Sequence, residues 1–215
     1  MRLRALLTGL GTALAVSLAG PAQAGPGEDL LLAARRDDGS RVMTLLLRGA
    51  DPNTRDERGR TALHLVLQEE SEKALNSLLA HPGLDVNALN ANGETPLMLA
   101  ALKGRLDWAK ALVWRGAQVN REGWTPLHYA CSGPDEGVAR WLLEQGAAID
   151  ARAPNGSTPL MLAAGYGGIS TAEILLQAGA DARLRNELQL SAADFAERAG
   201  RDKLAKLLRA AADKP

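Results

Sequence analysis

The chain has 215 residues, enough for one domain or a short array of repeats, with 25 Lys+Arg against 25 Asp+Glu. This balance argues against nucleic acid or a membrane surface as the partner, because both attract proteins through a basic excess. The single cysteine excludes an intramolecular disulfide, so packing alone must stabilise the fold. Abundant alanine and leucine, with only 3% aromatic residues, favour helices over strands.

Residues 1–24 have the order of a secretory signal peptide. Arg2 and Arg4 form a positive head, residues 5–20 carry no charge, and Ala22 and Ala24 place small residues where a signal peptidase reads. We expect cleavage after Ala24, which leaves 23 Lys+Arg against 25 Asp+Glu. An uncleaved anchor is the alternative, but a membrane span needs about 20 apolar residues. The sequence therefore predicts a periplasmic or secreted protein with no membrane association after cleavage.

A short sequence motif, called the phrase below, then recurs along the rest of the chain. It reads TALHLV, TPLMLA, TPLHYA, TPLMLA and, in a worn copy, SAADFA. The copies begin at Thr61, Thr95, Thr125, Thr158 and Ser191, at spacings of 34, 30, 33 and 33 residues. A period of this length is typical of repeat arrays rather than of a single globular core.

Each copy predicts the start of a helix, because Thr can cap the N-terminus and Pro tolerates the first helical turn. A second helix, with one apolar face around a Leu-Leu pair, follows in each unit. We expect it to end at a left-handed glycine: Gly49, Gly83, Gly116, Gly146 and Gly179. A tight turn with another glycine leads to the next copy: Gly59, Gly93, Gly123 and Gly156.

The phrase and its period resemble the ankyrin repeat, over almost all of residues 27–211. The resemblance implies an all-α fold, an ankyrin-repeat solenoid of stacked helical hairpins joined by β-hairpin-like turns. Within a domain of residues 25–215, it implies an N-terminal capping unit, four full units and a C-terminal cap. Their ranges are 27–59, 60–93, 94–123, 124–156, 157–189 and 190–212.

Two units depart from the common length. The 34-residue unit has one extra residue near His81, and the 30-residue unit has lost three residues between Gln118 and Gly123. We therefore expect a short turn there, with the outward-facing Trp114 covering the gap. Trp108 and Trp141 fall on second-helix positions that we expect to be buried.

The sequence predicts no catalytic residue, cofactor or metal site. In ankyrin repeats the histidine at the position of His64 and His128 bonds the backbone of a turn. These two lie two repeats apart, roughly 16–20 Å, too far to share an ion. Cys131 is read as a buried substitute for alanine, with a reactive thiol as the alternative. The glycines at 165–168 form an inter-helix turn rather than a phosphate loop.

The resemblance implies that turn tips and first helices line a concave, partner-binding face. Exposed aromatic side chains dominate many binding energies, so we select one patch: Trp124, Tyr129, Tyr166 and Leu102, rimmed by Lys103 and Glu122. The alternative for Tyr129 is partial burial, because leucines fill its position in other repeats.

A leader combined with these repeats resembles the periplasmic ankyrin proteins of Gram-negative bacteria. The resemblance implies a non-enzymatic module, which we expect to be a monomer, that binds another protein. Two roles stay open: a scaffold that supports a resident protein, or an inhibitor or immunity protein against a toxic effector. The competing class is a small-ligand receptor or an enzyme, which would need a concave pocket with convergent polar groups.

Overall fold

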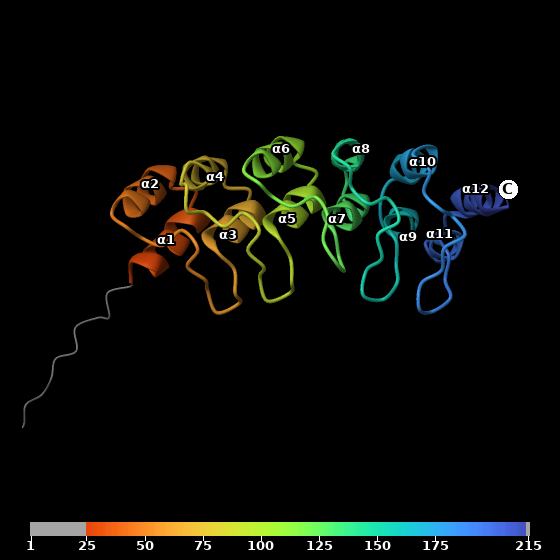
Figure 1. The fold of residues 1–215 in the computed structure, drawn as a ribbon, viewed down its shortest axis with the longest axis horizontal. Helices are drawn as coiled ribbons and strands as arrows, with labels where there is room; N and C mark the ends of the chain where they lie inside the picture. The colour runs from red at the N-terminus through yellow and green to blue at the C-terminus, as the bar shows by residue number, and fades with distance from the viewer. Residues whose placement is uncertain (1–24, 214–215) are drawn as a thin grey trace, which may run out of the picture.

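The computed structural model describes residues 25–213, which form twelve helices arranged as six hairpins (Figure 1). The first helices of the hairpins are α1 (Pro26–Arg35), α3 (Ala62–Glu69), α5 (Pro96–Leu102), α7 (Pro126–Ser132), α9 (Pro159–Gly165) and α11 (Ala192–Arg198). The second helices are α2 (Gly39–Leu47), α4 (Glu72–Leu79), α6 (Leu106–Trp114), α8 (Glu136–Glu144), α10 (Ile169–Gln177) and α12 (Asp202–Ala212).

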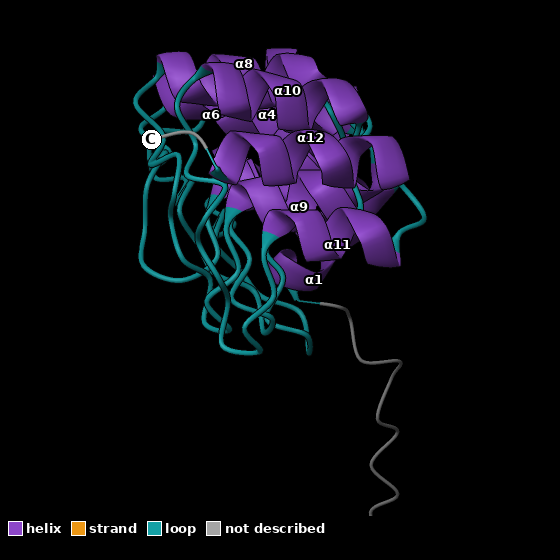
Figure 2. Ribbon diagram, turned by 90° about the vertical axis from the view of Figure 1, so that its right-hand side faces the viewer, coloured by secondary structure: helices purple, strands orange, loops and turns teal. Residues whose placement is uncertain are grey.

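The hairpins stack side by side, with first helices in one layer and second helices in another (Figure 1). The turns between hairpins all project from the same edge of this double layer (Figure 2). Residues 25–213 contain no strand, only two isolated antiparallel bridges, Arg55 with Thr61 and Arg185 with Ser191. The predicted all-α solenoid is confirmed. The segment expected to be a signal peptide, residues 1–24, lies outside the described residues.

The repeated threonine caps its helix as the sequence predicts. The Thr95 hydroxyl accepts the Met98 N–H at 3.3 Å, and the worn copy keeps the motif, since the Ser191 hydroxyl accepts the Asp194 N–H at 3.3 Å. These bonds satisfy N–H groups that no helical carbonyl can reach. The N-terminal unit lacks the phrase, yet it also has a first helix, α1.

The repeat histidines have the structural role that was expected. His128 is buried; its Nδ1 accepts the Thr125 N–H at 3.2 Å, and its Nε2 donates to the Ser157 carbonyl, one turn further along, at 3.0 Å. His64 does the same with Thr61 and with the Glu94 carbonyl. A ring that both accepts and donates is neutral. Burial accordingly lowers the pKa of both histidines below 6.5.

Four of the five glycines that were expected to end second helices do have a positive φ; the prediction for Gly83 is wrong. Gly49 follows the cap residue of α2 directly, at the position that favours left-handed backbone. The C-cap residue of α4 is Ala80. The position directly after the cap, which is glycine after α2, α6, α8 and α10, is therefore occupied by His81, and Gly83 lies two residues further along. The His81 Nδ1 accepts the Gly83 N–H at 3.2 Å instead.

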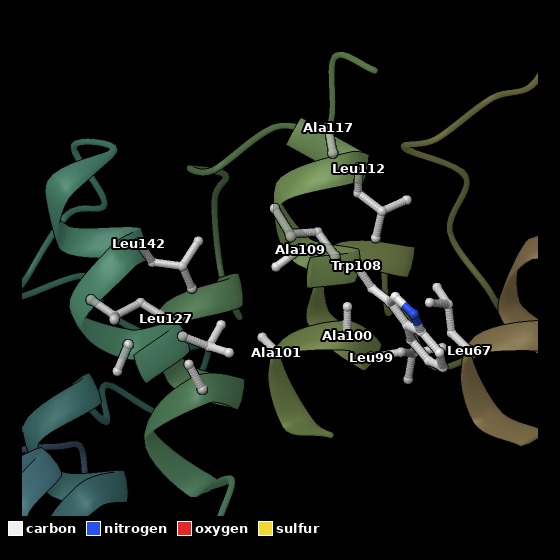
Figure 3. Close-up of a cluster of buried hydrophobic side chains, with 14 of the residues drawn as sticks. Leu67, Leu99, Ala100, Ala101, Trp108, Ala109, Leu112, Ala117, Leu127 and Leu142 are labelled. Carbon is white, nitrogen blue, oxygen red and sulfur yellow. The ribbon is translucent and has the colours of Figure 1, made fainter. Parts of the chain in front are cut away.

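One continuous apolar interior runs between the hairpins, built from leucines and many alanines (Figure 3). Trp108 is 4% exposed and lies beside Leu67 and Leu99, as Figure 3 shows. The expectation for Trp141 is only partly right, because that ring is half-buried at the edge of the interior. Cys131 is fully buried, as predicted for an alanine substitute.

Neighbouring hairpins approach so closely at one point that only glycine fits. A Cβ added to Gly167, in the turn between α9 and α10, would lie 2.0 Å from the carbonyl oxygen of Cys131 in α7. We predict that Gly167→Ala lowers the free energy of unfolding by about 2 kcal/mol or more, since overpacking forces backbone shifts. Urea unfolding followed by circular dichroism measures the change.

The matched control is Gly168→Ala in the same turn, where the nearest atom to an added Cβ is a serine hydroxyl at 3.3 Å. This control should cost less than about 1 kcal/mol, the scale of a helix-cap preference. Equal losses in the two variants would contradict the tight contact between Gly167 and Cys131.

The neutral histidines also predict how stability depends on pH. Because folding lowers their pKa, the folded state binds fewer protons than the unfolded state. Their contribution is therefore complete above pH 6.5 and is lost as pH falls below that value. Folding also lowers the pKa of Asp56 from 3.8, so the stabilisation from Asp56 is complete above that value and is lost only as pH falls below it, outside the range in which the histidines act. Replacing both histidines by Met should flatten the slope of unfolding free energy between about pH 7 and about pH 5.

Met is the appropriate replacement because the protein already uses it there. In the second full repeat, the Met98 sulfur accepts the Thr95 N–H at 3.3 Å. Urea unfolding across the pH range, compared with the unaltered chain, measures the slope. An unchanged slope in the double variant would assign the pH dependence to other groups.

Candidate protein-binding surface

The inner face of the array, where first helices meet the projecting turns, is hollowed on both sides of Trp124. The larger hollow, about 440 Å³, is lined by residues from Trp124 to Ala199, including Tyr166, Leu188 and Phe195. The smaller hollow, about 190 Å³, is lined by Leu102, Trp124, His128, Tyr129 and Ser132. Trp124 is therefore the wall that the two hollows share.

Trp124 owes its position to the short turn, residues 118–124. This turn projects less than its neighbours, as predicted from its missing residues (Figure 1). In the preceding turn the Asn90 N–H donates to the Glu94 carbonyl at 3.1 Å. In the short turn, the Arg121 guanidinium instead donates to the Gly93 and Trp124 carbonyls, at 3.2 and 3.3 Å. The Trp124 side chain consequently lies close to helix α7.

The Trp124 ring packs edge-on against two rings of α7. Its centroid lies 5.3 Å from that of His128 and 6.5 Å from that of Tyr129. Such T-shaped pairs are favourable and fix the orientation of a ring. The other tryptophan near the short turn, Trp114, is 85% exposed on α6, so the expectation that it covers the gap is wrong.

Tyr129 is half-buried, which agrees with the alternative of partial burial. Its hydroxyl donates to Oε1 of Glu94, across the groove between two repeats, at 3.2 Å. Burial, followed by the nearby Glu94 charge, raises the pKa of Tyr129 to about 12. The phenol therefore stays protonated at neutral pH, and its ring forms one side of the smaller hollow with Leu102.

Tyr166 lies in the larger hollow and is 67% exposed. Its ring packs edge-on against Phe195 of α11, at 6.5 Å between centroids. The rim residues behave differently from each other. The Lys103 ammonium turns toward the preceding repeat and pairs with Glu70 at 3.1 Å, whereas Glu122 is exposed on the short turn. Of the six selected residues, the structure brings Leu102, Trp124 and Tyr129 together and sets Tyr166 on the far side of Trp124.

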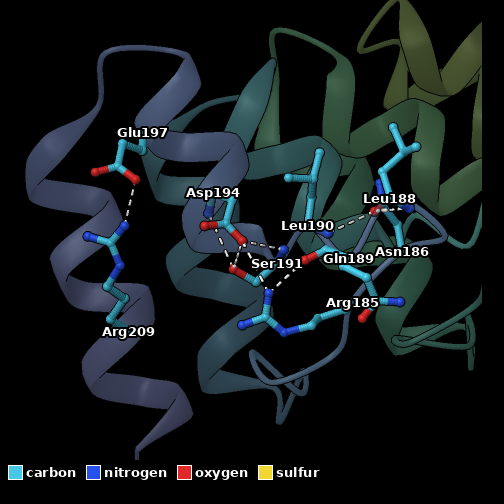
Figure 4. Close-up of polar contacts among 9 residues, drawn as sticks. All are labelled: Arg185, Asn186, Leu188, Gln189, Leu190, Ser191, Asp194, Glu197 and Arg209. Atoms are coloured by element: carbon cyan, nitrogen blue, oxygen red, sulfur yellow. Dashed lines mark hydrogen bonds and ion pairs between the residues drawn. The ribbon is translucent and has the colours of Figure 1, made fainter.

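One wall of the larger hollow was not predicted from the sequence; it is formed by Leu188, Leu190 and Phe195. Leu190 and Phe195 fall in the unit 190–212 that was interpreted as a cap, and Leu188 lies just before it, so no binding role was assigned to them. The Asn186 side-chain oxygen accepts the N–H groups of Leu188 and Leu190, both at 3.0 Å, and fixes this turn (Figure 4). The available signal was the pair of leucines, because the matching positions of the other full-length turns are polar. Leu188 is 75% exposed.

The described residues offer little for chemistry. Residues 25–213 contain no group of three or more metal-ligating side chains. Burial raises the pKa of the Cys131 thiol, which disfavours the thiolate that a nucleophile needs. Across the same residues, every helix is too short or too polar to cross a bilayer. The features of this face that a partner could contact are the apolar and aromatic side chains that line the two hollows.

Comparison with known proteins agrees with this architecture. The family model for ankyrin repeats (3 copies) matches residues 30–122, 73–153, 115–186 and 137–214. Over 67% of the present chain, the sequence is 34% identical to the chicken nuclear factor NF-kappa-B p105 subunit. Over the same share of the chain, it is 31% identical to the mouse B-cell lymphoma 3 protein homolog. It is 32% identical to the human transient receptor potential cation channel subfamily A member 1 over 74%.

The chain spans only part of each of these relatives, namely 16%, 34% and 15% of their lengths. All three are animal proteins, and none of them supports the expected bacterial origin. The recognition of the repeat itself is confirmed by the family model, which covers nearly every described residue. This chain belongs to the ankyrin-repeat family.

Proposed function

We propose that this chain binds another protein on its inner face and acts as a non-enzymatic scaffold or support for that protein. The observation that carries the proposal is the pair of hollows on either side of Trp124. Aromatic side chains in such positions contribute much of the binding energy at protein interfaces. The rigid stack beneath them holds Trp124, Tyr129 and Tyr166 in place before a partner arrives, which lowers the entropic cost of binding.

The competing class, a small-ligand receptor or an enzyme, finds less support. A small-molecule site encloses most of its ligand. Tyr166 and Leu188 in the larger hollow are instead mostly exposed, as residues of an open interface would be. Near the smaller hollow, both ring nitrogens of His128 already bond the protein, and Cys131 is buried. Neither His128 nor Cys131 is therefore free to act on a bound substrate.

The proposed binding surface predicts a loss of affinity in one pair of variants. The purified protein is used to capture its partner from an extract of the native host, and calorimetry then measures the affinity of the identified partner. Trp124→Ala combined with Tyr166→Ala should weaken binding by about 2 kcal/mol or more, the scale of an interface hot spot. Trp114→Ala, which removes an exposed ring from the outer helix layer, should leave the affinity unchanged.

The same measurement distinguishes the two roles that the sequence leaves open. A scaffold should hold a resident protein at moderate affinity. An inhibitor or immunity protein should capture one effector with a dissociation constant of about 1 nM or below, as tight enzyme inhibitors do. If the Trp124 and Tyr166 variants bind as tightly as the unaltered chain, the inner face is not the interface.

We further propose that the protein works in the periplasm or outside the cell after cleavage following Ala24. That site directly precedes Gly25, the N-cap residue of α1, so cleavage would leave the first hairpin whole. Expression in a Gram-negative host followed by mass spectrometry of the periplasmic fraction should find a mature chain that begins at Gly25. Replacing Ala22 and Ala24 by bulky residues should leave the precursor uncut. A full-length chain in the cytoplasm would contradict export.

A further inference from the structure

We propose that the larger hollow binds an extended, acidic segment of the partner, with an apolar side chain in the hollow and a neighbouring carboxylate on Arg198. This inference rests on the proposed function and adds the chemistry of the partner. It depends on three features of the hollow: an apolar floor, a single cation at the rim, and an unused amide on the opposite wall.

The floor exists because one repeat lacks a side chain. Gly165, the last residue of α9, aligns with Leu102 and Ser132 of the two preceding repeats. Without a Cβ there, the Phe195 ring of the next hairpin lies 3.1 Å from the point that the Cβ would occupy. Leu162 and Leu190 complete the apolar lining. A leucine-sized or aromatic side chain of a partner would bury this surface, and burial of that kind drives association.

Arg198 is the only charged residue among those that line the larger hollow. It is exposed at the end of α11, and no carboxylate within residues 25–213 forms an ion pair with it. The adjacent Glu197 is already neutralised by Arg209, at 2.6 Å (Figure 4). Arg201, the next arginine, is occupied by the carbonyls of Ala163, Ala164 and Gly167. The guanidinium of Arg198 is thus available to a carboxylate, which it can bind through two parallel bonds.

The opposite wall supplies a hydrogen-bond donor. The Asn155 side-chain oxygen accepts the Ser157 N–H at 3.0 Å, which leaves its amide N–H₂ with no partner in the described chain. The Asn186 side chain, by contrast, accepts two N–H groups of its own turn and donates to the Ser157 hydroxyl. Donors on both walls and an apolar floor between them match a segment that offers carbonyls, a carboxylate and one apolar side chain. A polyanion such as nucleic acid would need a row of cations rather than one.

Selection of random peptides displayed on phage, against the purified chain, tests this chemistry directly. We expect enrichment of sequences in which Asp or Glu lies close to a large apolar residue. Fluorescence anisotropy with a selected peptide then measures affinity. Arg198→Glu should weaken binding about tenfold or more, because a charge-assisted bond is replaced by repulsion. Lys110→Glu, on the outer helix α6, makes the same change of charge and should have no effect.

A charge swap makes the test specific to the pair. A peptide in which the acidic residue is replaced by Lys should bind poorly to the unaltered chain and regain affinity for the Arg198→Glu variant. Circular dichroism confirms that each variant remains folded.

Two other outcomes would overturn the inference in different ways. If Trp124→Ala abolishes binding while Arg198→Glu has no effect, the inner face binds partners but not through this carboxylate contact. If no peptide is enriched, or if peptides bind regardless of both substitutions, neither the inference nor the proposed binding surface holds.

Discussion

The close approach of neighbouring first helices is the constraint on which the rest of this structure depends. One hairpin has two apolar faces and cannot bury both, so each must pack against the next. Small residues allow that approach, and Gly167, in the turn that follows α9, leaves the least room for an added side chain against the Cys131 carbonyl of α7. Once the stack is formed, side chains of the inner layer are fixed by packing, and only the turns and the outward positions are free to vary. Recognition must therefore use those positions.

The repeat histidines connect the turns to this stack through hydrogen bonds, but only two of the repeats have such a histidine. His64 donates to the Glu94 carbonyl and His128 to the Ser157 carbonyl, each at the residue before the next capping position. Where Met replaces His, the sulfur can only accept the N–H of its own threonine. In the repeats with Met98 and Met161, the carbonyls at the matching positions belong to Trp124 and Leu190 and receive no imidazole bond from the described chain. Both of these residues line the larger hollow, so its two bounding turns lack the imidazole bond.

Most of the fold could be predicted because the same sequence signals for helix starts and ends recur in each repeat. Thr95-Pro96 and its counterparts mark helix starts, and four glycines mark helix ends at a constant distance from the Leu-Leu pairs. Gly83 failed because one inserted residue changes that distance, which a pattern of residue types does not register. The candidate site was predictable only in part. Trp124 and Tyr166 were found as rare aromatics, but the hollow between them depends on a missing side chain at Gly165, and on the Phe195 ring of the next hairpin, which only the three-dimensional register brings together.

The site lies where the array is least regular, and the physical reason follows from the packing. At one repeated position of the inner face the first helices have Leu65, Leu99 and Leu162, and all three leucines are buried; Leu162 forms part of the floor of the larger hollow. At the same position Tyr129 is too large to be buried completely and bonds Glu94 instead. The short turn brings Trp124 toward α7, where its ring packs on Tyr129. The three lost residues and Tyr129 thus shape the smaller hollow and supply the shared Trp124 wall, whereas Gly165 opens the larger hollow. A distinct shape of this kind is what a specific partner can recognise.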